Sequence, residues 1–132
     1  MKAKSIIALA LAAALAAAGC GGDDADAAEP GDQAKGPAFV EEVQFIFLES
    51  YPVQVRATIV GTVPTPCHEA VAEVTDTDAG AGTVTVDLYS LADPDEVCAQ
   101  VLEPFEVTVD VGSFETGDYT LIIDEAEYPF TI

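Results

Sequence analysis

The sequence predicts an all-β domain over residues 38–132, a seven-stranded antiparallel sandwich with one short helix. Three observations favour this fold class. Apolar and polar residues alternate with a period of two through most of the segment, which is typical of strands that bury one face. Clusters of Gly, Pro, Asp and Ser separate the alternating runs. The segment has 95 residues (132 minus 37), which is enough for a single domain with one small core.

Seven segments are expected to form the strands. They are residues 43–47, 53–59, 70–75, 84–88, 105–111, 119–123 and 128–132. The alternation is clearest in the fifth segment and weakest in the third, and the polar face on each strand favours antiparallel pairing. Pro129 has no backbone N–H to donate to a ladder, so the last strand is expected at the edge of a sheet.

One connection carries the signals of a short helix. Asp93 suits the N-cap, Pro94 suits the first helical position and Glu96 lies three residues after the cap. Pro104 disfavours helical geometry in the residue before it. We therefore expect a helix from Pro94 to about Leu102.

The first twenty residues have the features of an export signal. Lys2 and Lys4 supply a positive charge ahead of an apolar run over residues 6–18. That run is shorter than the roughly 20 residues that a membrane-spanning helix needs. The residues that follow, Ala-Ala-Gly-Cys at positions 17–20, resemble the lipobox of bacterial lipoproteins, with Ala where Leu is usual.

The lipobox resemblance implies that residues 1–19 are a signal peptide and that Cys20 becomes a lipidated N-terminus, which anchors the chain in a membrane. An ordinary secretory signal with an incidental cysteine is the alternative. Residues 20–37 are expected to be the lipidated cysteine and a disordered acidic tether, because they lack aromatic and branched aliphatic side chains. Gly21 follows the cysteine where the enterobacterial sorting rule places Asp for inner-membrane retention. The resemblance thus implies a cell-envelope protein, in the outer membrane of a host with two membranes and otherwise on the outer face of the plasma membrane.

A second motif concerns the architecture of the domain. The residues Phe114, Gly117 and Tyr119, followed by an alternating strand, resemble the tyrosine corner of immunoglobulin-like and fibronectin-type sandwiches. The usual pattern there is Leu-x-x-Gly-x-Tyr before the penultimate strand. The resemblance implies an immunoglobulin-like sandwich in which the Tyr119 hydroxyl bonds to the chain a few residues upstream. It implies nothing about activity, because this fold carries many unrelated functions.

With Cys20 assigned to lipid, two cysteines remain. An even number of cysteines in an exported domain indicates disulfide pairing, so we expect Cys67 and Cys98 to form a disulfide. The alternative is a copper or zinc site that uses Cys67, His68 and Cys98 as ligands. No CxxC or HxxxH spacing supports that alternative.

The charge of the chain excludes one class of partner. All 24 acidic residues follow Cys20, where only Lys35 and Arg56 are basic, so the formal net charge there is −22. Such a field repels nucleic acid and attracts cations and basic proteins. A solvated, aggregation-resistant surface is one explanation. Calcium binding is another, and its candidate ligands are Asp76, Asp78, Asp93, Asp95 and Glu96.

No group of residues in the sequence indicates a reaction. His68 is the only histidine, and neither Ser50, Ser90 nor Ser113 lies in a GxSxG motif. We expect a membrane-anchored envelope lipoprotein that is not an enzyme and acts as a binding or structural module. Its expected partners are the membrane, through the lipid anchor, and a basic protein or cation, but not nucleic acid. The alternatives are a domain that binds calcium or another cation, and a small envelope enzyme. Calcium is the only cofactor that the sequence suggests. The sequence indicates no oligomeric state.

Overall fold

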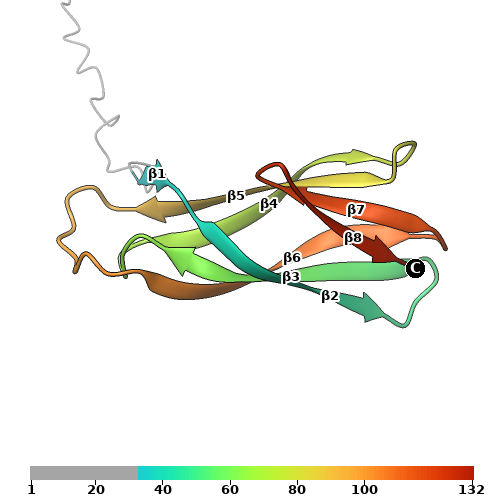
Figure 1. Cartoon of the computed structure of the whole chain (residues 1–132), viewed down its shortest axis with the longest axis horizontal. Helices are drawn as coiled ribbons and strands as arrows, with labels where there is room; N and C mark the ends of the chain where they lie inside the picture. The colour runs from blue at the N-terminus through green and yellow to red at the C-terminus, as the bar shows by residue number, and fades with distance from the viewer. Residues whose placement is uncertain (1–32) are drawn as a thin grey trace, which may run out of the picture.

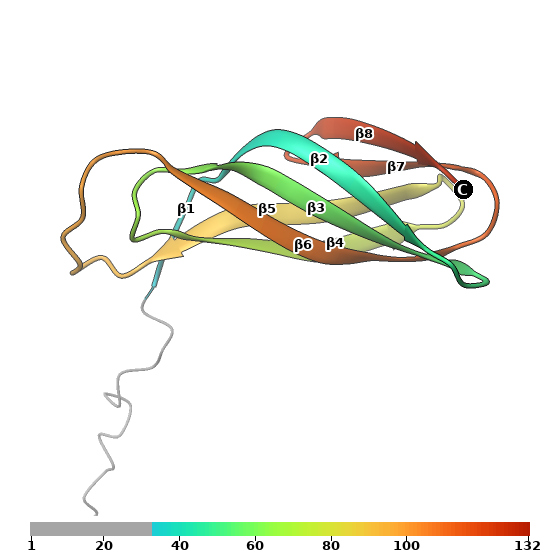
Figure 2. The ribbon, with the colours of Figure 1, turned by 90° about the horizontal axis from the view of Figure 1, so that it is seen from below.

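The computed structural model describes residues 33–132, which form eight strands arranged as two sheets packed face to face (Figures 1 and 2). The strands are β1 (Ala34–Gly36), β2 (Phe39–Leu48), β3 (Val53–Val63), β4 (Glu69–Asp78), β5 (Thr83–Ala92), β6 (Glu103–Phe114), β7 (Asp118–Ile123) and β8 (Ala126–Thr131). The predicted β-sandwich is therefore confirmed. Within this part of the chain, no helix is long and apolar enough to cross a membrane.

The smaller sheet has three strands in the order β2-β3-β6, all antiparallel. The larger sheet has five. In it β5 pairs with β4 along one edge, while β1 and β7 pair with the two halves of its other edge. The last strand, β8, pairs with β7 and forms an edge, as its proline predicts.

One pairing departs from the antiparallel expectation. β5 and β7 run parallel, with Thr83 opposite Thr120 and Val86 opposite Ile123. The reason is the path of the chain, which leaves the larger sheet after β5, returns along the smaller sheet as β6, and re-enters the larger sheet as β7. A crossover of this kind brings a strand back in the direction of the earlier one.

Each of the seven predicted strands coincides with or overlaps an observed one, but the count of seven is wrong because of β1. Residues 34–36 fall in the segment predicted to be a disordered tether, and they pair instead with Ser90–Ala92 of β5. Pairing of backbone groups needs no apolar side chain. The buried Ser90 hydroxyl also donates a 2.7 Å hydrogen bond to the carbonyl of Pro37. The ordered domain thus begins before Ala38.

The predicted helix over residues 94–102 is wrong. Asp93 does organise a turn, since its carboxylate accepts from the backbone N–H of Asp95 at 2.9 Å, but the following residues are not helical. The apolar side chains of this loop, Val97, Val101 and Leu102, remain exposed. A helix this short is stable only when an apolar face packs against the protein, and these side chains find no such surface.

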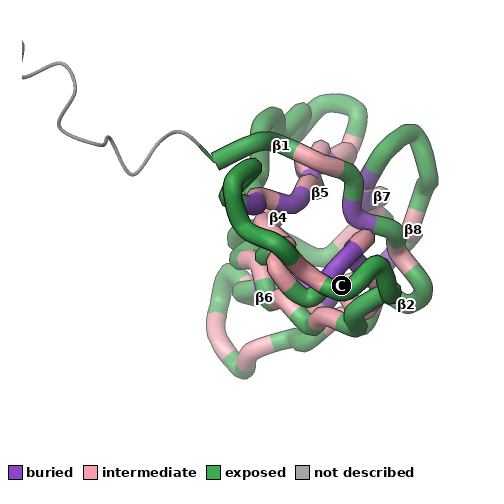
Figure 3. The backbone as a smooth tube through the Cα atoms, turned by 90° about the vertical axis from the view of Figure 1, so that its left-hand side faces the viewer, coloured by how far each residue is buried: buried purple, intermediate pink, exposed green. Residues whose placement is uncertain are grey.

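The core is one apolar layer between the two sheets (Figure 3). Its buried members alternate along the strands, as the period of two predicts. They are Ala38, Val55, Ala57, Ile59, Val63, Val84, Val86, Leu88, Val111, Phe114, Leu121, Ile123 and Phe130. Most of the charged residues lie on the outward faces of the two sheets and at the two ends of the sandwich, together with a few exposed apolar side chains such as Ile46 and Val74.

Candidate functional site

The sandwich has two ends of different character (Figure 1). The N-terminal end comprises β1 with the loops at residues 64–68 and 93–102. The pocket end comprises the turns at residues 79–82 and 115–117. β5 runs from one end to the other, and its ten residues at about 3.3 Å each separate them by about 30 Å.

The N-terminal end is closed by a disulfide between Cys67 and Cys98, whose Cα atoms lie 6.0 Å apart. It joins the residues that precede β4 to those that follow β5, so it ties together the open ends of this hairpin. The predicted disulfide is confirmed.

In this arrangement the two cysteines are not available as ligands for copper or zinc. The two sulfurs are bonded to each other, whereas a metal would need them as thiolates. A carboxylate oxygen of Glu96 lies within 4.8 Å of both sulfurs, and this is the only group of three ligating side chains within mutual reach in residues 33–132. His68 is not part of the group. Its Nδ1 atom lies 2.7 Å from the Thr65 hydroxyl.

The calcium candidates are not brought together. Asp76 and Asp78 lie on β4 toward the pocket end, whereas Asp93, Asp95 and Glu96 lie in the loop at the N-terminal end. Asp78 accepts a 3.0 Å hydrogen bond from the backbone N–H of Ala81, as a cap of the β4–β5 turn. Both halves of the candidate set therefore organise turns, and the structure does not join them into one oxygen-rich site.

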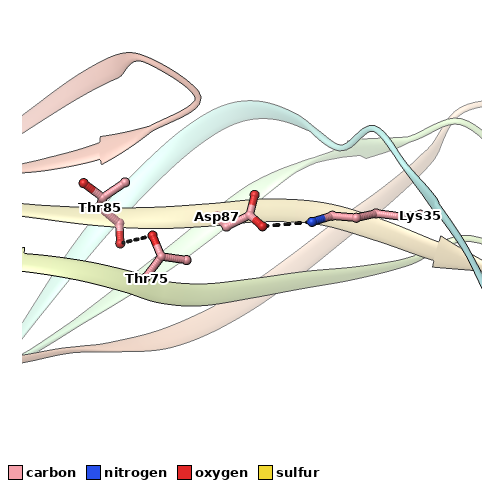
Figure 4. Close-up of polar contacts among 4 residues, drawn as sticks. All are labelled: Lys35, Thr75, Thr85 and Asp87. Atoms are coloured by element: carbon pink, nitrogen blue, oxygen red, sulfur yellow. Dashed lines mark hydrogen bonds and ion pairs between the residues drawn. The ribbon is translucent and has the colours of Figure 1, made fainter. Parts of the chain in front are cut away.

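A polar cluster that the sequence pattern did not reveal lies on the outer face of the larger sheet, and Figure 4 shows the contact between its Lys35 and Asp87 side chains. The Lys35 ammonium on β1 contacts the Asp87 carboxylate at 2.9 Å and lies 3.9 Å from the centre of the Tyr89 ring. The hydrogen bond to Asp87 raises the pKa of Lys35 above its usual value. Desolvation, and then the nearby Glu73 carboxylate, raise the pKa of the Tyr89 hydroxyl. The cluster fastens β1 to β5, and only the register of these strands reveals it.

The second ion pair of the described chain lies on the other sheet. Arg56 Nε on β3 contacts the Asp110 carboxylate on β6 at 2.7 Å. Lys35 and Arg56 are the only lysine or arginine in residues 33–132, and their ion pairs are with Asp87 and Asp110, so the remaining carboxylates there form no ion pair with a lysine or arginine.

At the pocket end, Tyr119 joins two features. Its hydroxyl donates a 3.0 Å hydrogen bond to the carbonyl of Glu115, four residues upstream. Its ring packs against Phe114 with centroids 4.7 Å apart and against Phe130 with centroids 5.5 Å apart. Gly117, which lies between Glu115 and Tyr119 in the sequence, forms two backbone hydrogen bonds with Ile132, one in each direction.

A cavity of about 330 Å³ opens beside Tyr119, between the β4–β5 turn and the β6–β7 connection. Two acidic residues, four residues with a hydroxyl group and two aromatic residues are in its lining. The lining residues are Thr77, Asp78, Ala79, Gly82, Thr83, Ser113, Phe114, Glu115 and Tyr119. The residues come from four strands and two turns, so spacing along the sequence could not reveal them as one site.

The model of the ORF11 beta-sandwich domain matches residues 57–132. The chain belongs to this family. Comparison with curated proteins and with solved structures finds no match. The ORF11 domain match includes both disulfide cysteines, Tyr119 and every residue that lines the cavity, while β1, β2 and the start of β3 precede it.

The ORF11 domain has one further residue with a perturbed pKa, Asp124 in the two-residue turn between β7 and β8. Desolvation, and then the Asp87 carboxylate, raise its pKa above the ordinary value of 3.8. Both turn residues have positive φ, 48° at Asp124 and 70° at Glu125, as in a type I′ hairpin. Asn and Asp tolerate this geometry better than most residues.

We predict that removing the disulfide destabilises the domain. The bond closes a loop with a sequence separation of 31, which the chain-entropy relation converts to about 3–4 kcal/mol. Urea unfolding of the Cys67→Ser, Cys98→Ser double variant should show this loss in the free energy of unfolding. The reduced wild-type chain is the matched control and should behave alike; a loss below about 1 kcal/mol in both would contradict the role assigned to the bond.

We predict that Asp124→Asn stabilises the domain in a pH-dependent manner. Because the folded-state pKa is raised, the charged carboxylate is disfavoured in the folded state. The protonated form favours folding below the unfolded pKa of 3.8, and this contribution is lost as the pH rises through the folded pKa. The gain from the amide should therefore be larger at pH 7 than at pH 3. Thermal unfolding measures it.

The control for this prediction is Glu41→Gln, which removes an exposed carboxylate from β2. This control measures the gain in stability that comes from removing one negative charge anywhere on a chain with this net charge. An equal gain at pH 7 in the two variants would contradict a specific penalty at Asp124.

Proposed function

We propose that this chain is a lipid-anchored lipoprotein of the cell envelope whose ORF11 domain is a non-enzymatic binding module. The observation that carries the proposal is the placement of the cavity. Residue 20, the proposed anchor, precedes β1, and β1 lies at the N-terminal end of the sandwich. The carboxylate-lined cavity lies at the other end, about 30 Å away along β5. A ligand could therefore reach it without approaching the membrane.

The anchor itself is proposed from residues that lie outside the described part of the chain. The charged start, the apolar run and Cys20 resemble a lipoprotein signal. Two acyl chains are sufficient for stable attachment, because each buried methylene contributes about 0.8 kcal/mol. The proposed site is the outer membrane in a host with two membranes and the outer face of the plasma membrane in a host with one.

The non-enzymatic role is supported by the position of His68. This side chain lies at the N-terminal end beside Thr65, remote from the cavity and its two carboxylates. A hydrolase of the serine or cysteine type needs a base beside its nucleophile. The partner favoured by the −22 charge is a basic protein or a cation.

We also propose that Gly117 and Tyr119 act as a tyrosine corner, as in immunoglobulin-like sandwiches. The hydrogen bond from the Tyr119 hydroxyl to the Glu115 carbonyl supports this, since it has the direction and the span expected of such a corner. The resemblance to immunoglobulin-like domains concerns this corner and the two-layer architecture. The parallel pairing of β5 with β7 sets the strand order apart from theirs.

The anchor is tested by expressing the full chain in a bacterium and measuring the mass of the mature protein. We expect a chain that begins at Cys20, carries diacylglycerol and fractionates with membranes. Cys20→Ser should abolish both properties, while the control Cys67→Ser should retain them. A mature chain that starts elsewhere, with an unmodified sulfur at Cys20, would contradict the anchor.

The corner is tested by Tyr119→Phe, which removes only the hydroxyl. We expect the free energy of unfolding to fall by about 0.5–1.5 kcal/mol, the usual contribution of one hydrogen bond. Tyr128→Phe is the control, because the structure gives the Tyr128 hydroxyl no hydrogen bond. Equal effects of the two substitutions in urea unfolding would show that the Tyr119 bond has no special role.

A further inference from the structure

We propose that the cavity at the pocket end binds one organic cation, a guanidinium or a primary ammonium group. This inference deepens the proposed binding role and names its ligand class, but it does not depend on the lipid anchor. It is carried by the charge, the shape and the rigidity of the cavity.

The charge of the cavity is uncompensated. Asp78 and Glu115 are in its lining, and no lysine or arginine is. The two basic side chains of the described domain are held elsewhere by Asp87 and Asp110. Asp78 uses one carboxylate oxygen for the Ala81 N–H, and an ionised carboxylate has about four acceptor sites. The cavity therefore offers acceptors to a ligand that brings positive charge and N–H donors.

The shape favours an organic cation over a metal ion. Calcium takes 6–8 oxygen ligands at about 2.3–2.6 Å, and no three acidic, cysteine or histidine side chains from this cavity lie within mutual reach. The rings of Phe114 and Tyr119 supply apolar wall instead. A volume of about 330 Å³ is at the small end of ligand cavities, which suits a single side chain or a small amine.

A carboxylate and an aromatic ring together contact a cation elsewhere in the same molecule. On the outer face of the larger sheet, the Lys35 ammonium contacts one carboxylate, that of Asp87, and one tyrosine ring, that of Tyr89. The cavity presents the same two chemical groups without an internal cation. Aromatic rings attract Lys and Arg head groups electrostatically, in addition to the attraction of the carboxylates.

The walls of the cavity are fixed before any ligand arrives. The Gly82 carbonyl accepts a 2.8 Å hydrogen bond from the Thr120 N–H, which joins the β4–β5 turn to β7. Gly82 has a φ of +68°, and a Cβ there would lie 3.1 Å from the Asp118 carbonyl, so the turn requires glycine. The Tyr119–Glu115 hydrogen bond holds the opposite wall. Rigid walls lower the ordering cost of binding.

The test uses the full chain, labelled with ¹⁵N and held in micelles of a neutral detergent, and follows backbone amide shifts during titration with N-acetyl-arginine amide. We expect saturable shifts confined to residues 77–83 and 113–119. N-acetyl-citrulline amide, which has nearly the same shape but no charge, should produce none. Equal shifts with the two compounds, or shifts spread over the acidic outer faces, would overturn the proposal.

Three variants locate the site. Glu115→Gln and Asp78→Asn should each weaken binding by up to about fivefold, the upper end of the range for a single exposed charge pair. The amide at position 78 can still accept from Ala81, so the turn is kept. Glu106→Gln removes an equal charge from the outer face of the smaller sheet and should leave the affinity nearly unchanged. A loss as large in Glu106→Gln as in Glu115→Gln would assign binding to the general field and overturn the site.

Two further measurements separate the source of the cation and the role of the anchor. A Gly-Gly-Arg-Gly-Gly peptide and agmatine present the same guanidinium on a peptide and on a free amine. Tighter binding of the peptide assigns the natural source to a protein, and tighter binding of agmatine assigns it to a small amine. The Cys20→Ser chain should bind both compounds with the affinity of the wild type. Failure of the anchor proposal would therefore leave binding unchanged, whereas failure of the cation-site proposal would abolish binding in both chains.

Discussion

One apolar layer between the two sheets holds this domain together against the repulsion of its own carboxylates. Val55, Ile59 and Leu121 in that layer are almost entirely removed from water. Burial of such side chains contributes about 1.5–3 kcal/mol each. Only Lys35 and Arg56 offset the 24 acidic residues that follow Cys20. Self-repulsion of this size destabilises a compact state, so the layer, the disulfide and the two ion pairs must together exceed it.

The same imbalance of charge links the fold to the proposed function. Both basic side chains join strands: Lys35 fastens β1 to β5, and Arg56 joins β3 to β6. None remains for the cavity, where Asp78 and Glu115 face solvent without an internal counter-ion. The carboxylates thus keep the outer faces solvated, and in the cavity two of them form the cation site proposed above. The proposed anchor and the cavity divide the molecule into a membrane-proximal and a ligand-facing end.

The period of two predicted the seven strands and, where the alternation is clear, the side that is buried, because burying one face of a strand requires that pattern. Val55, Ala57 and Ile59 show it on β3. The pattern could not reveal β1, whose pairing uses backbone groups, nor the parallel β5–β7 pair, which depends on the path of β6. The helix signals around Asp93 were correct for a turn only, since Val97 and Leu102 have nothing to pack against. The cavity joins residues that only the folded register brings together.

The balance between the apolar layer and the charges is tested most directly by urea unfolding across a range of NaCl concentrations at pH 7. Salt screens like charges, with a Debye length of about 10 Å at 0.1 M and about 3 Å at 1 M. The account predicts that the unfolding midpoint rises steadily with salt while the slope of the transition stays constant. A midpoint that is unchanged or falls would show that the carboxylates do not oppose folding, and would contradict the account.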